Sequence, residues 1–80
     1  MMNIVVAFEN GKRFVIYDNG VIRETNEEES IFIVKNLDKE KFDKITKSGK
    51  KIFICNDNED ICLSKVASKV FGRPKSCKFA

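Results

Sequence analysis

Two Asn-Gly steps constrain the fold of this chain more than any other feature. Asn10-Gly11 and Asn19-Gly20 each stand between apolar, β-favouring runs. Asn-Gly in that setting predicts a tight hairpin with a type I′ turn, in which both central residues adopt positive φ. Two such turns in succession predict a three-strand meander at the start of the chain.

The remaining pattern predicts further strands that alternate with two helices. A helical spacing of apolar residues, ended by Gly72 and Pro74, marks the second helix. The segment 30–35 is either a short strand or an extended lead-in to the first helix. The fold class is therefore α/β (α+β): a three-strand antiparallel meander followed by (β)αβα, with a mixed sheet packed against two helices. One compact domain, 1–80, is expected, with a basic tail at 73–80.

The expected strands differ in how apolar they are. Residues 4–8 are all apolar, which favours a central strand buried on both faces. Residues 21–25 are more polar and favour a place near an edge, where a partner strand could add. The strand at 52–55 follows a helix directly, so it is expected to pair in parallel with the first strand.

The first helix is expected at 38–48. Asp38 is a suitable N-cap, and Leu37 and Phe42 stand where a hydrophobic staple would place them. Phe42 and Ile45 are the apolar residues at helical spacing, so both are expected to face the sheet.

Composition limits the class of protein. Apolar residues make up 42% of the 80, enough for one core, and no run approaches the length of a membrane span. The three cysteines are an odd set without a CxxC, which argues against a secreted disulfide framework. A cytoplasmic protein with no membrane contact is the prediction.

No residue pattern predicts catalysis, a metal site or a cofactor. The chain has no histidine, the commonest general base and a frequent zinc ligand. Cys55 and Cys62 flank a strand-to-helix loop, where α/β sheets place ligands, so a reactive thiol or a soft-metal site is one interpretation. The favoured interpretation is two free thiols packed in the core.

The order of elements resembles two known groups of proteins. A meander followed by α-β-α is similar to the ribonuclease H-like topology, whose metal-dependent chemistry needs acidic residues that converge from strand ends. The strand at 3–8 carries no internal acid. The opening from Asn3 to Val21 also resembles the start of nitrogenase-cofactor carrier domains. The histidine-containing ligand loop of that family is absent, so no residue is carried over.

Charge is distributed unevenly along the chain. The net charge is −3 over residues 1–34 and +6 over 35–80, for a total of +3. Such asymmetry indicates an electrostatically steered partner, and a solvated lysine-rich face is the alternative. The residues expected to contact a partner are the acidic loop, the basic C-terminal region and one terminal aromatic side chain: Glu27, Glu28, Glu29, Lys65, Lys69, Arg73, Lys75, Lys78 and Phe79.

The predicted function is that of a small non-enzymatic binding protein acting through its surface on a protein or nucleoprotein partner. An inhibitor of a host protein or nucleoprotein complex, encoded by a phage or mobile element, is a concrete version. One alternative is a metal or cluster carrier that uses Cys55 and Cys62. Another is a nucleic-acid-binding regulator whose basic C-terminal region contacts the phosphate backbone. A homodimer is compatible with each of these.

Overall fold

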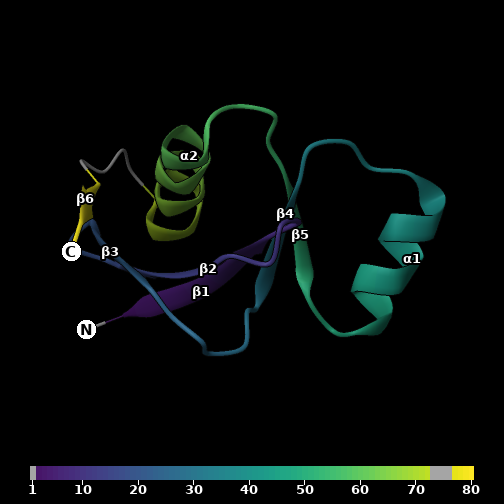
Figure 1. Ribbon diagram of the computed structural model, residues 1–80, viewed down its shortest axis with the longest axis horizontal. Helices are drawn as coiled ribbons and strands as arrows, with labels where there is room; N and C mark the ends of the chain where they lie inside the picture. The colour runs from purple at the N-terminus through teal and green to yellow at the C-terminus, as the bar shows by residue number, and fades with distance from the viewer. Residues whose placement is uncertain (1, 73–76) are drawn as a thin grey trace.

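A mixed sheet of six strands and two helices forms the molecule (Figure 1). The structure is a computed structural model and describes residues 2–72 and 77–80. The strands are β1 (Asn3–Phe8), β2 (Arg13–Tyr17), β3 (Val21–Glu24), β4 (Ile31–Val34), β5 (Lys51–Ile54) and β6 (Lys78–Phe79). The helices are α1 (Lys39–Lys47) and α2 (Glu59–Phe71). The predicted α+β fold class is confirmed, and 31–34 is a full strand.

Both predicted hairpins are present, but their turn type was predicted wrongly. Positive φ occurs at Gly11 and Gly20, and at none of the described non-glycine residues. The bonds from Gly11 N–H to Phe8 O and from Phe8 N–H to Lys12 O therefore describe a three-residue loop that ends in a left-handed glycine.

The asparagine side chains explain this choice of turn. Asn10 Oδ1 accepts the Lys12 N–H at 3.0 Å, and Asn19 Oδ1 accepts the Val21 N–H at 3.1 Å. Each asparagine thus makes a local turn through its side chain while its backbone stays at negative φ.

The sheet order is β5-β4-β1-β2-β3-β6. β1 lies at the centre, antiparallel to β2 and parallel to β4, as its apolar sequence predicted. One expectation about neighbours was wrong. β5 pairs in parallel with β4 and not with β1, because β4 is a full strand that lies between them. β3 lies near an edge of the sheet, as predicted, and β6 pairs in parallel with its outer side.

The main core lies between the sheet and α2. Alternate strand residues point to this face and pack against four buried residues of the helix: Cys62, Leu63, Val66 and Ala67. The sheet contributes Val6, Phe8, Phe14, Ile16, Ile22, Ile31 and Ile33. Each residue of this core is at most 9% exposed, so α2 is fixed firmly over β1 and β2.

The opposite face of the sheet is covered by α1 and by one short connection. α1 packs beside β5, and Ile45 is its buried residue. Residues 25–30 lead from β3 to β4 across β2 and β1, on the side away from α2 (Figure 1). We call this connection the strap. Its ends are held by the bonds from Thr25 N–H to Arg13 O and from Ser30 N–H to Val5 O.

The ends of both helices follow the sequence. Asp38 caps α1 by accepting the Lys41 N–H at 2.8 Å, and Gly72 ends α2 in the left-handed conformation. Ile45 faces the sheet as expected, but the expectation that Phe42 does so was wrong: Phe42 is 48% exposed, because α1 presents a narrow buried stripe around Ile45. Leu37, the expected staple partner of Phe42, is 37% exposed. None of the helices described is long and apolar enough to cross a membrane.

Replacing Asp38 by Ala is expected to lower the free energy of unfolding by about 1 kcal/mol, because a helix-end N–H loses its acceptor. Urea denaturation measures the change. Asn58→Ala is the matched control, since Asn58 is the N-cap of α2 but its side chain makes no capping hydrogen bond. Equal losses in the two variants would contradict the assigned role of Asp38.

Candidate functional site

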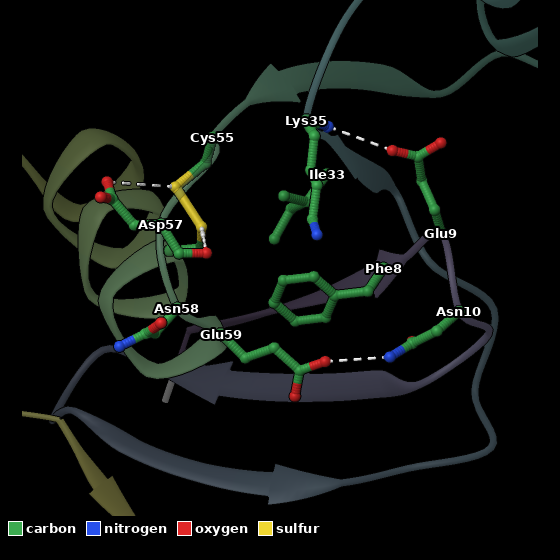
Figure 2. A pocket seen from close by; sticks show the side chains of 10 residues that line it. Phe8, Glu9, Asn10, Ile33, Lys35, Cys55, Asp57, Asn58 and Glu59 are labelled. Carbon is green, nitrogen blue, oxygen red and sulfur yellow. Dashed lines mark hydrogen bonds between the residues drawn. A yellow bond between two sulfur atoms is a disulfide. The ribbon is translucent and has the colours of Figure 1, made fainter.

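A pocket of about 550 Å³ opens at the carboxyl ends of the parallel strands β1, β4 and β5. This is the edge at which sheets of this kind commonly bind ligands. Phe8 and Ile33 form an apolar floor, and Figure 2 shows both side chains pointing into the space between Cys55 and Glu9. The other lining residues are Asn10, Lys35, Asp57, Asn58, Glu59 and Cys62.

One wall of the pocket is a disulfide between Cys55 and Cys62. It joins the residue after β5 to the first turn of α2, with Cα atoms 5.8 Å apart (Figure 2). The sequence correctly placed both cysteines in the core, at 6% and 1% exposure, but it was wrong in treating them as free thiols. The register of strand, loop and helix brings the two sulfur atoms together, which spacing alone did not reveal.

The disulfide lies among oxygen atoms of the loop between β5 and α2. Cys55 Sγ lies 3.8 Å from Asp57 Oδ2, and Cys62 Sγ lies 3.5 Å from the Asp57 carbonyl oxygen. Glu59 and Asp60 add negative charge in the first turn of α2. The disulfide acts here as a structural wall.

Three carboxylates line the mouth of the pocket, and each has a lysine partner on the surface. Glu9 pairs with Lys41 at 2.9 Å, Glu59 with Lys12 at 3.7 Å, and Asp57 with Lys65 at 2.5 Å. These side chains are between 38% and 56% exposed, so each pair contributes little to stability. The rim therefore presents carboxylates in exposed ion pairs, which can exchange partners.

Glu9 is the most strongly held of the three. The hydrogen bond from Lys41 Nζ, followed by the backbone N–H of Lys35 at 3.1 Å, holds the pKa of Glu9 below its usual 4.5. Its charge therefore persists into mildly acidic solution. Glu59 is oriented by Asn10, whose Nδ2 donates to Oε2 at 3.0 Å.

A second charged cluster lies on the strap side of the sheet. Glu29, 6% exposed, accepts a hydrogen bond from Arg13 Nε at 2.9 Å and another from Lys50 Nζ. Glu29 was expected to contact a partner from an acidic loop. The structure instead turns its carboxylate inward, where it ties the strap to β2 and to the segment before β5. Glu28 stays 82% exposed, with Lys50 Nζ 3.6 Å away.

The residues predicted to bind a partner do not form one surface among the residues described. Lys65 and Lys69 lie one turn apart on α2, and Lys65 is paired with Asp57. Lys78 and Phe79 form β6, and the ring of Phe79 lies 6.3 Å from that of Phe14. Arg73 and Lys75 lie outside the described residues. Glu27 is exposed and bonded to Thr25.

Within the residues described, no group of three or more His, Cys, Asp or Glu side chains is arranged to hold a metal ion. The metal-carrier alternative thus stays a prediction, as does binding to nucleic acid. No family model matches the chain, and no curated protein or solved structure matches it either. The resemblance to nitrogenase-cofactor carrier domains stays a prediction as well.

Sequence reasoning identified the loop beside the pocket but missed the pocket. Cys55 and Cys62 were singled out because they flank a strand-to-helix loop. Phe8, Glu9 and Ile33 were missed because their meeting with that loop depends on the strand order. Taking 31–34 as a strand between β1 and β5 could have found them. The C-terminal ends of three parallel strands then meet at one edge of the sheet.

Proposed function

We propose that the chain is a small non-enzymatic binding protein that holds a protein partner by receiving one of its basic side chains in the pocket at the ends of β1, β4 and β5. The observation that carries the proposal is a pocket with an apolar floor, formed by Phe8 and Ile33, beneath a rim of exposed carboxylates. A partner bearing arginine on a protruding loop has the required chemistry.

The pocket has the two properties that a long basic side chain needs. The aliphatic stem of the partner's side chain would lie on Phe8 and Ile33, and this contact removes apolar surface from water. Its guanidinium group would reach Glu59 or Asp57 at the rim. Arginine forms two parallel hydrogen bonds with a carboxylate, so it can displace the single exposed lysine ammonium that each carboxylate now holds.

A blocked arginine peptide, acetyl-Gly-Arg-Gly-amide, tests the proposal in a titration followed by NMR. We expect the amide signals of Phe8, Ile33 and Glu59 to shift with a dissociation constant on the order of 1 mM, as befits one side chain. Glu59→Gln is expected to weaken binding about three- to tenfold, because a charge-assisted hydrogen bond is lost.

The matched control peptide replaces arginine by citrulline, which keeps the shape and removes the charge. Citrulline is expected to bind more weakly by a similar factor. Glu28→Gln, at an exposed carboxylate outside the pocket, is the control variant and should leave the titration unchanged. Equal shifts with both peptides, or shifts confined to residues away from the pocket, would refute the proposal.

The more specific interpretations from the sequence remain proposals. Inhibition of a host protein or nucleoprotein complex is one way in which such a protein would act, with a basic groove of the host as the target. The other proposal is a cytoplasmic location. A cysteine-alkylation assay on cells quenched in acid tests this location, because the cytosol keeps most protein thiols reduced. An oxidised Cys55–Cys62 pair would argue for a different compartment.

A further inference from the structure

We propose that the chain forms a symmetric homodimer in which β5 of one copy pairs antiparallel with β5 of a second copy. β5 is the last strand of the sheet order, and among the described residues its outer edge pairs with no other strand. The edge at the other end of the sheet, β6, has only two residues. β5 is therefore the longer exposed edge.

The backbone groups that β5 leaves free can be identified. Lys51 donates its N–H to Ser30 O at 3.0 Å, and Cys55 donates to Val34 O at 2.9 Å. Successive residues of a strand direct their N–H and C=O groups to opposite edges. Ile52 and Ile54 thus point both groups away from β4, at the open edge.

These free groups define one self-complementary register. When two copies of β5 run antiparallel with Phe53 on the two-fold axis, Ile52 of each copy lies opposite Ile54 of the other. Residues whose N–H and C=O both face the partner form the hydrogen-bonded pairs of an antiparallel ladder. The register therefore supplies four hydrogen bonds, two from each Ile52–Ile54 pair, and leaves neither residue's backbone unpaired.

The side chains fit the same register. Ile52 and Ile54 point to the face that carries α1, since Phe53 and Cys55 point to the α2 core. Ile54 is 58% exposed in one copy and would be covered by Ile52 of the second. Phe53, partly buried, would meet its own symmetry mate on the other face as an aromatic cross-strand pair.

Charge favours a second copy as the occupant. Lys51, which is exposed, stands at the start of β5, and Asp57, which is 43% exposed, follows its end. Antiparallel pairing places the basic start of one strand beside the acidic end of the other, at both ends of the contact. A parallel arrangement would place like charges together. A uniformly acidic or basic foreign strand would satisfy only one end.

The edge also lacks most of the devices that keep exposed strands from pairing. β5 has no proline, and Lys51 is its one charged residue. The contact is short, however, because it uses four residues from each copy. We therefore expect a reversible dimer with a dissociation constant on the order of 10–100 µM.

Sedimentation velocity over a concentration series tests the proposal with a proline variant. Ile54→Pro removes the outward N–H without touching a bond to β4, and proline is tolerated on an edge strand whose N–H faces solvent. It should raise the dissociation constant at least about tenfold, because two of the four hydrogen bonds lose their donor. Ile54→Val keeps the N–H and is expected to dimerise like the parent chain.

Hydrogen exchange of the unmodified protein gives a second readout that does not depend on how well a variant folds. The amides of Ile52 and Ile54 should exchange rapidly in dilute solution and become protected at high concentration, while Lys51 and Phe53 stay protected throughout. A monomer at every concentration, or unchanged self-association in a folded Ile54→Pro, would overturn the proposal. Concentration-dependent protection elsewhere, with Ile52 and Ile54 unaffected, would overturn it too.

Discussion

Reduction of the Cys55–Cys62 disulfide is expected to lower the melting temperature by about 10–20 °C. The bond joins residues seven apart in the sequence. Closing so short a loop restricts the unfolded chain by about 2–3 kcal/mol, and each kcal/mol corresponds to about 4–8 °C in a domain of this size. Thermal unfolding followed by circular dichroism, with and without a phosphine reductant, measures the shift.

Alkylation followed by mass spectrometry provides the control. The oxidised protein, once unfolded, should take up label only at Cys77, whose thiol is free, and the reduced protein should take it up at all three cysteines. Cys77→Ser is the matched variant, and its melting temperature should respond to reductant as that of the parent chain does. Identical melting temperatures in the two redox states would show that the bond does not hold β5 against α2.

Substitution of Glu29 is expected to produce the second large effect. Glu29→Gln preserves the shape of the side chain but leaves Lys50 and Arg13 without their charged acceptor. The free energy of unfolding should fall by about 1–3 kcal/mol at neutral pH. Chemical denaturation measures the loss. Glu28→Gln is the control, because Glu28 also lies near Lys50 but is 82% exposed.

The effect of Glu29→Gln should depend on pH in a defined way. Burial raises the pKa of Glu29, but the hydrogen bonds from Lys50 and Arg13 outweigh burial and bring the pKa below its usual 4.5. The stabilisation is therefore present above pH 4.5 and is lost as the pH falls through the lowered value. Unfolding curves of parent and variant should converge in acid.

At high pH the same cluster loses its other partner. The hydrogen bond from Lys50 to Glu29 raises the pKa of Lys50 above its usual 10.5. The contribution of Lys50 is thus complete below pH 10.5 and disappears as the pH rises through the raised value. A difference between parent and variant that stays constant across the whole pH range would contradict the assignment of this cluster.

The sequence predicted the elements of this fold well where local chemistry determines them. Asn10-Gly11 and Asn19-Gly20 marked both hairpins, and Asp38 and Gly72 marked helix ends correctly. The turn type was wrong because the Asn10 side chain accepts the Lys12 N–H and so stabilises a turn in which Asn10 keeps a negative φ. The turn propensity of Asn-Gly does not distinguish a type I′ turn from a three-residue loop that ends in glycine.

What the sequence did not predict depends on contacts between distant segments. The place of β5 next to β4 required 31–34 to be a full strand, and its four β-favouring residues left that open. The inward turn of Glu29 required Arg13 and Lys50 on either side of the strap. The pocket follows from that strand order, so it was beyond the reach of local patterns, whereas the disulfide depends on the geometry of β5, the loop and α2.

The strap gives the two faces of the sheet unequal resistance to opening. α2 covers its face with four buried side chains, whereas six residues cover Val5, Ala7 and Val15 on the other. Release of the strap would break the Glu29 pairs with Arg13 and Lys50 and the hydrogen bonds at its two ends, but it would leave the α2 core intact. Proteases that attack the native ensemble should therefore be able to cut between β3 and β4 without unfolding that core.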